Sequence, residues 1–183
     1  MNNFTNTSDA ELNALYESGE RRVLNEFNRI KLPELVEALK KPGYVNLPPL
    51  HQRRVLWDSV QQSRLIESFI ANIPVPPMVF YEQEHKSYEV IDGRQRISTI
   101  QGFYENQLRL TGLELWSELN RYTYAELPWK VRTALDHRSI SYIVIITPIE
   151  STSSEALYLK QLAFERLNIS RATELSANDP DSR

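Results

Sequence analysis

The chain of 183 residues contains no cysteine, only five glycines and only three histidines. The absence of cysteine excludes disulfides, thiol catalysis and cysteine-ligated zinc. No apolar run approaches the roughly 18 residues that a membrane-spanning helix needs, so we expect no association with a membrane. The first residues also lack the basic region and the apolar stretch of a signal peptide. We therefore expect a cytoplasmic protein.

A broad excess of basic residues is missing as well. The net charge is −3 and the isoelectric point is near 5.7, which argues against a wide basic surface for nonspecific binding of nucleic acid. Most of the cations are arginines, and Lys86 is the only lysine between His51 and Tyr122. The planar guanidinium group matches phosphate or carboxylate oxygens two bonds at a time. A compact anion site is therefore compatible with this acidic chain.

The histidines and the large aromatic residues do not indicate a catalytic centre. His51, His85 and His137 do not have the spacing of metal ligands, and we expect each to be a surface or packing residue. We expect Trp116 and Trp129 to lie in the hydrophobic core.

Hydrophobic periodicity and capping patterns predict the order of the elements. Helices are expected after the capping box Ser8–Glu11, over Val23–Ile30, and over 33–41, 59–72, 94–104, 127–137 and 152–168. A hairpin is expected from 78–82 and 87–91, and a central strand buried on both faces from the β-branched run 140–149. This order predicts a single compact α+β domain over 1–183, with a mixed sheet and flanking helices. Its parts would be a helical N-terminal part (1–43), an α+β core (44–170) and a polar tail (171–183).

The stretch "YEVIDGRQRISTIQGFY", Tyr88 to Tyr104, predicts a strand that runs directly into a helix. The helix would begin after Gly93, and its N-terminus carries free N–H groups and a partial positive charge, which attract anions. Arg94 and Arg96 are unfavourable to the helix at this end, so their presence favours an anion site. In the alternative interpretation Asp92 caps the helix, Gly93 makes the turn and both arginines are solvated.

Four segments together resemble a known family. "VIDGRQRISTI" resembles the DGQQR motif of the N-terminal domain of GmrSD-type modification-dependent restriction proteins. "LPPLHQRRVLW", "RLIESFIANIPVPPMVFYE" and "LAFERLN" resemble further motifs of that family, in the same order, between Leu47 and Asn168. In this chain Arg94 stands where the motif has its first glutamine.

The resemblance implies a ParB/sulfiredoxin-like fold and a domain that binds nucleoside triphosphates, often with NTPase activity, as a switch in phage defence. Carried over position by position, it implies catalytic roles for Asp92, Gln95 and Arg96. It implies nucleotide-binding roles for Gly93, Arg94, Gln52, Arg53, Arg166 and Asn168.

The same resemblance implies Mg²⁺ bound with the nucleotide, a nuclease domain or protein as partner, and DNA reached through that partner. Arg94 and Arg96 would hold phosphate oxygens, and Asp92 would orient a metal-bound or attacking water or only fix the turn. Two alternatives stay open at this point. One is a DNA-binding or nicking ParB-like module, which requires a wider basic surface. The other is a non-catalytic domain that recruits a partner.

Overall fold

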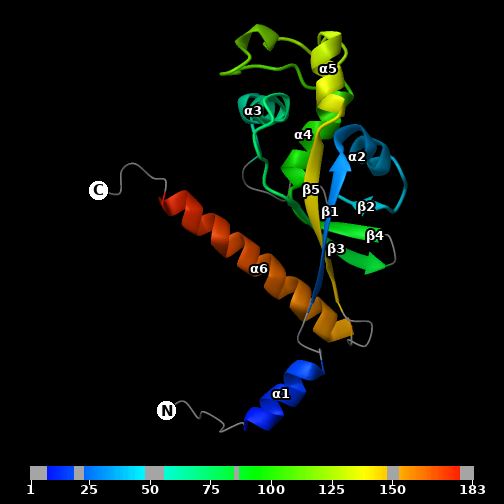
Figure 1. The fold of residues 1–183 in the computed structure, drawn as a ribbon, viewed down its shortest axis with the longest axis vertical. Helices are drawn as coiled ribbons and strands as arrows, with labels where there is room; N and C mark the ends of the chain where they lie inside the picture. Colours follow the sequence, from blue (N-terminus) through cyan, green and yellow to red (C-terminus); the bar gives the residue numbers. More distant parts are fainter. Residues whose placement is uncertain (1–7, 19–22, 48–55, 85–86, 148–152, 178–183) are drawn as a thin grey trace. The chain divides into compact units, whose positions relative to one another are not determined.

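The computed structural model describes most of the chain, namely residues 8–18, 23–47, 56–84, 87–147 and 153–177. The described helices are α1 (Asp9–Glu17), α2 (Leu32–Leu39), α3 (Ser59–Ile70), α4 (Arg94–Tyr104), a short 3₁₀ helix η2 (Ser117–Leu119), α5 (Trp129–Asp136) and α6 (Ser153–Ala177) (Figure 1). The described strands are β1 (Leu24–Lys31), β2 (Val45–Asn46), β3 (Met78–Glu84), β4 (Ser87–Asp92) and β5 (Ser139–Ile146).

Local sequence signals account for where several helices begin. The hydroxyl of Ser8 accepts from the N–H of Glu11, and the Glu11 carboxylate accepts from the N–H of Ser8, so the predicted capping box is confirmed at α1. Asp58 and Gln61 form the same reciprocal pair at the start of α3. Proline occupies the first turn of α2, where its missing N–H costs nothing.

The strands form one mixed sheet with the order β1-β5-β3-β4-β2. The predicted hairpin is confirmed, because β3 and β4 pair antiparallel, whereas β2 pairs parallel with β4. The predicted α+β class with a mixed sheet is therefore confirmed. Strand β5 has a neighbour on each side, but of its residues only Ile140, Val144 and Ile145 are buried, and the others are half-buried. Its two faces are therefore not equally covered.

The N-terminal segment differs from the prediction at one element. The stretch Val23–Ile30, which we expected to be helical, forms most of strand β1. Its apolar residues fit a helical spacing, but Leu24 and Phe27 are 61% and 76% exposed, so they form no buried helical stripe. Pairing with β5 at the edge of the sheet decides the conformation of this segment. The pattern of residues within the segment gives no information about that pairing.

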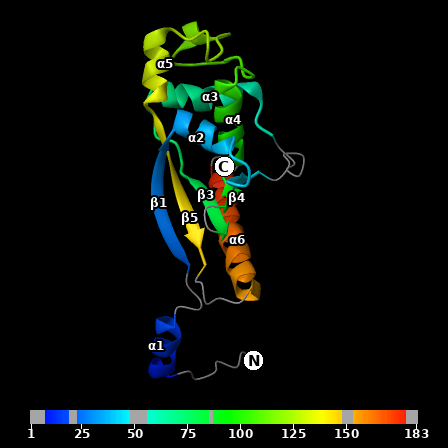
Figure 2. The same ribbon diagram turned by 90° about the vertical axis from the view of Figure 1, so that its right-hand side faces the viewer.

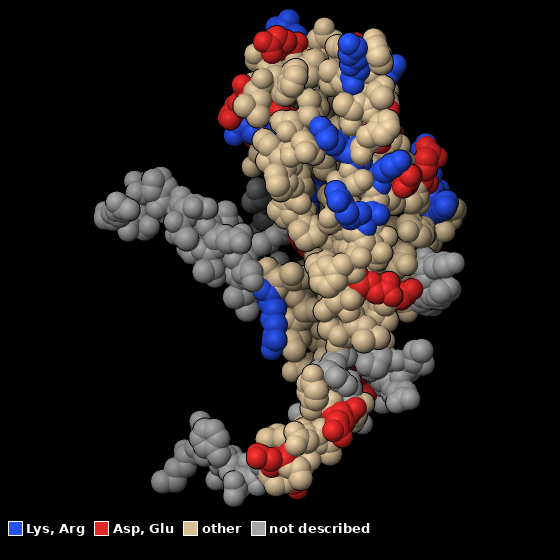
Figure 3. All heavy atoms as spheres, in the orientation of Figure 1, with Lys and Arg blue, Asp and Glu red and all other residues tan. Residues whose placement is uncertain are grey.

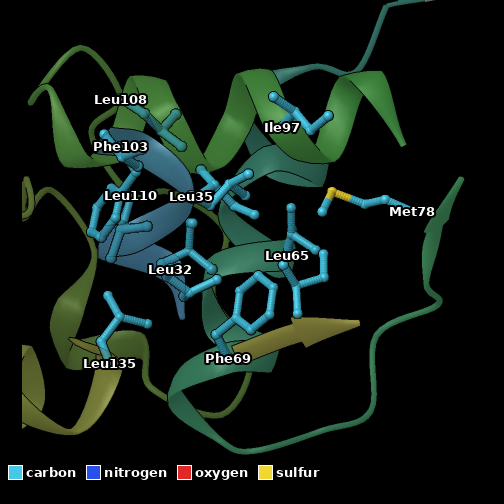
Figure 4. Close-up of a cluster of buried hydrophobic side chains, with 14 of the residues drawn as sticks. Leu32, Leu35, Leu65, Phe69, Met78, Ile97, Phe103, Leu108, Leu110 and Leu135 are labelled. Carbon is cyan, nitrogen blue, oxygen red and sulfur yellow. The ribbon is translucent and has the colours of Figure 1, made fainter. Parts of the chain in front are cut away.

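The hydrophobic core lies between the sheet and helices α2, α3, α4 and α5. Figure 4 shows side chains from these helices pointing toward one another, with Met78 of β3 at one end of the cluster. Figure 2 shows α2, α3 and α4 lying to the same side of β1 and β5. Our expectation for two tryptophans is wrong, since Trp116 and Trp129 are 42% and 66% exposed.

Two compact units are distinguished by their internal contacts: Met1–Asn25 together with Ile145–Arg183, and Glu26–Val144. The second unit contains the core and the segment Asp92–Arg96. A single domain over 1–183 stays a prediction. None of the helices in the described part of the chain combines the length and the apolar character that a membrane span requires.

Candidate anion-binding site

The strand-to-helix junction predicted from the sequence is present, and Asp92 is the last residue of β4. Asp92 is paired with Val79, while Val90 is paired with Phe80, so the ladder skips Ile91. An extra residue of this kind bends the strand and changes the direction of the side chains beside it. Such irregularities are frequent next to functional sites, and here one immediately precedes the acid of the motif.

Gly93 is the N-cap residue of α4 and has φ = 98°, which an L-residue with a side chain rarely adopts. A Cβ atom at this position would lie 2.7 Å from Cγ and 2.9 Å from Cβ of Met78. Both the turn and the close approach to β3 therefore require glycine. The N-cap residue is Gly93, which makes no side-chain cap bond, so the part of the alternative interpretation that made Asp92 the cap is wrong.

Arg94 and Arg96 occupy the first turn of α4, and both are buried, with 7% and 6% of their surface exposed. The expectation of solvated arginines is therefore also wrong. The same turn contains no acidic residue. Two guanidinium groups thus lie out of water at the helix end that is already positive, where a cation is unfavourable unless a negative group compensates it.

Asp92 compensates one of these charges. Nη2 of Arg96 donates to Oδ2 of Asp92 at 2.7 Å and to the carbonyl of Pro77 at 3.2 Å. Both bonds use the same nitrogen. The buried Nε of Arg96 has no hydrogen-bond partner among the described residues, so the guanidinium group retains donors for a further acceptor.

Gln95 connects the junction to the segment that precedes α3. Its Oε1 accepts a hydrogen bond of 2.6 Å from the backbone N–H of Trp57. Trp57 is the last residue of "LPPLHQRRVLW", and its side chain packs against the core. The structure therefore joins the two motifs through residues that are 38 positions apart in sequence.

The remaining predicted site residues are not brought to this junction by anything that the structure describes. Gln52 and Arg53 lie outside the described residues. Arg166 is exposed on α6, which belongs to the other unit, and the side chain of Asn168 is not among those described. Their roles stay predictions.

A buried acid that we did not single out in the sequence stabilises a loop near the core. Glu67 of α3 is 5% exposed, and its carboxylate accepts backbone N–H bonds from Glu114 (3.2 Å), Leu115 (2.7 Å) and Trp116 (2.8 Å). The signal was present, since Glu67 interrupts the apolar face of the predicted helix. Three bonds to one backbone segment indicate a structural role.

A second polar cluster was also missed. The hydroxyls of Tyr104 and Tyr124 both donate to Oδ1 of Asp136 at 3.0 Å, and the two rings stack with their centroids 4.4 Å apart. Burial, reinforced by Asp136, raises the pKa of Tyr104 far above its ordinary value and raises the pKa of Tyr124 to about 12. The hydroxyls therefore stay protonated at neutral pH, and the cluster connects α4 to α5.

Histidine contributes little to either cluster. His137 is exposed at the end of α5, with Nδ1 2.7 Å from the carbonyl of Thr133, and His51 and His85 lie outside the described residues. Within the part of the chain that is described, no group of three or more His, Asp or Glu side chains is placed to hold a metal ion.

Comparison with protein families gives a match over most of the chain. The family described as the N-terminal domain of the GmrSD restriction endonuclease matches residues 34–179. This range includes the junction, Trp57 and the closing segment on α6. No curated protein and no solved structure matches the chain. The ParB/sulfiredoxin-like assignment therefore stays a prediction.

Proposed function

The chain belongs to the family of GmrSD restriction endonuclease N-terminal domains, and on this premise we propose that it is a nucleotide-binding switch domain of a restriction-type defence system. The observation that carries the proposal is the burial of Arg94 and Arg96 in the first turn of α4. A domain that needed only a stable turn would gain from an acid there, because an acid complements the helix dipole.

The triphosphate of a nucleotide supplies the negative charge that this turn favours. We assign the phosphate oxygens to Arg94, to the unused donors of Arg96 and to the N–H groups of the helix N-terminus. Gly93 makes the turn with φ = 98° that places the N-terminus of α4 directly after β4. For Gln52, Arg53, Arg166 and Asn168 the family resemblance also implies nucleotide-binding roles.

Asp92 has two roles in this proposal. It holds Arg96 in place through the 2.7 Å ion pair, and it faces the phosphates as the nearest acid of the motif. Magnesium ions are commonly held by one or two carboxylates together with phosphates and waters, and Asp92 fits that requirement. When bound, Mg²⁺ would supply charge neutralisation to the phosphates. Gln95 then acts as a positioning residue, because it bonds the backbone of Trp57.

The position of Trp57 suggests how nucleotide binding reaches a partner. A ligand that shifts the first turn of α4 also shifts Gln95 and therefore the segment before α3. In a restriction-type system the partner that responds is a nuclease domain or protein. This coupling is a proposal about a switch and requires no hydrolysis, although hydrolysis would reset it.

Thermal unfolding with nucleotides tests the proposal. Each nucleoside triphosphate with Mg²⁺ is added at millimolar concentration to the wild type, to Arg94→Gln and to the matched control Arg64→Gln. Arg64 is an arginine of α3 that forms an exposed ion pair with Glu114. A ligand at about 100 times its Kd stabilises by roughly 2.7 kcal/mol, which for a chain of this size raises Tm by about 5 to 10 °C.

The expected result is a nucleotide-dependent rise in Tm for the wild type and for Arg64→Gln, with most of the rise lost in Arg94→Gln. Each variant is compared with its own ligand-free Tm, so a change in basal stability does not affect the comparison. No rise with any nucleotide in the wild type would refute nucleotide binding. An undiminished rise in Arg94→Gln would place the site elsewhere. Phosphate release in the same samples separates binding from NTPase activity.

A further inference from the structure

A surface groove lies along strands β1 and β5 within the unit Glu26–Val144. One part of it has a volume of about 490 Å³ and is lined mainly by residues at the end of α3 and the start of β5. The adjoining part, of about 460 Å³, is lined by residues of β1 and β5 and by Pro77. Arg29, Val75 and Ser141 line both parts, so they form one continuous feature, which we call the β1–β5 groove.

Strand alternation explains which side chains line the groove. Side chains of β5 point alternately to the two faces of the sheet, and Ile140 and Val144 are buried on the core face. Ser139 and Ser141 have the opposite parity, are half-buried and line the groove. By the same alternation, Phe27 and Arg29 of β1 share one face of their strand.

The described ionisable residues that line the groove are Arg29, His137 and Arg138, and no described aspartate or glutamate lines either part. Arg29 forms no ion pair with any of the residues described. Arg138 donates through Nε to the carbonyl of Phe69 and through Nη2 to the carbonyl of Ile70. These bonds fix its guanidinium group beside the groove and leave Nη1 as the donor for a ligand.

The surface view agrees with this local charge. On the face that Figure 3 shows, several Lys and Arg side chains gather over the region where β1, β5 and α2 meet, with acidic side chains at the edge of this gathering. The chain as a whole has a net charge of −3. A local basic patch can nevertheless attract an anion to this part of the surface.

The exposed aromatic ring of Phe27 lines the part of the groove that Pro77 also lines. Phe27 is 76% exposed on the sheet surface, two residues from Arg29. An apolar ring in this position also suits a protein partner. However, Arg29 lies beside the ring, the hydroxyls of Ser139 and Ser141 line the groove, and no described acid lines it. These features favour a ligand that has flat rings joined by phosphates.

We propose that the β1–β5 groove binds a single strand of DNA. Phe27 stacks on a base, Arg29 and Arg138 contact successive phosphates, and the serine hydroxyls donate to phosphate or base oxygens. Single-strand-binding surfaces combine a cationic groove with an aromatic stacking platform in this way. The choice of DNA rests on the restriction-type family, whereas the site itself is independent of the junction at Arg94 and Arg96.

Fluorescence anisotropy with a labelled oligothymidylate of about 12 nucleotides tests the assignment. With few phosphate contacts we expect a Kd on the order of 10⁻⁵ M at low salt. Phe27→Ala and Arg29→Gln should each weaken binding at least about fivefold, because base stacking and a phosphate contact are lost. In Arg29→Gln the slope of log K against log salt should fall by about 0.7, the value for one contact to a single strand.

The controls are matched in chemistry and lie outside the groove. Trp129→Ala removes an exposed aromatic ring, and Arg64→Gln removes an exposed arginine, so both should leave the affinity unchanged. Equal loss in these controls, no binding by the wild type, or equal affinity for a duplex or an RNA strand of the same length would overturn the proposal. The nucleotide-dependent rise in Tm should persist in Arg29→Gln, which separates this site from the one at the junction.

Discussion

Arg96 should be essential for stability, although an arginine in the first turn of a helix is electrostatically unfavourable. Its guanidinium group is buried, donates to Asp92 and Pro77, and leaves Asp92 only 14% exposed. Truncation to alanine leaves that carboxylate without its cation. Breaking a buried ion pair costs about 3 to 5 kcal/mol, and the partial exposure of Asp92 places the expected cost near 3 kcal/mol.

A loss of this size should lower Tm by about 6 to 12 °C for a chain of this length. The assay is thermal and urea unfolding of Arg96→Ala, with Arg64→Ala as the control. The Arg64–Glu114 pair is more than half exposed on both sides, so its loss should cost at most about 1 kcal/mol. Asp92→Asn and the double variant complete a cycle in which the two losses should not add.

Equal stability losses in Arg96→Ala and Arg64→Ala would refute the buried-pair interpretation. So would strict additivity of Asp92→Asn and Arg96→Ala. Either result would mean that the Arg96–Asp92 pair contributes no more to stability than an exposed ion pair. The ligand-free measurement is sufficient, so this test does not depend on nucleotide binding.

Three further results are expected. Gly93→Ala should cost about 3 kcal/mol in urea unfolding, because positive φ and the approach to Met78 both oppose a Cβ, whereas Gly43→Ala, with positive φ but open space, should cost only about 1 kcal/mol. Val144→Asp should abolish soluble expression, since the position is 3% exposed and a buried charge without a partner costs several kcal/mol or so; a soluble variant that melts cooperatively would contradict this. Between pH 10 and about 12 the stability advantage of wild type over Tyr124→Phe should shrink, because the raised pKa of Tyr124 lets the unfolded state lose its proton first; a constant difference would contradict it.

Local sequence was sufficient for the elements whose signals are local. The capping pair at Ser8, the apolar stripe of α3 and the hairpin β3–β4 each depend on residues close together in the chain. Their hydrogen bonds form within a few residues, so propensity and periodicity predict them. Helix α5 was likewise predicted, although the exposure of its first residue, Trp129, was not.

Strand β1 is an element that local sequence signals did not predict. The apolar residues of Val23–Ile30 are compatible with a helix, and only pairing with β5 selects the strand. That partner lies more than a hundred positions away, so no pattern within the segment reveals it. The same pairing creates the groove, because it sets Phe27 and Arg29 beside Ser141.

At the junction the sequence by itself determined the composition of the site: a glycine turn between a strand and a helix, flanked by an acid and two arginines. Tertiary structure decided which of these residues meet and which leave water. Arg94 and Arg96 are buried, Arg96 pairs with Asp92, and Gln95 binds the backbone before α3. The physical reason is that burial and charge pairing depend on the segments packed around a residue, whereas a turn depends mainly on its own dihedral angles.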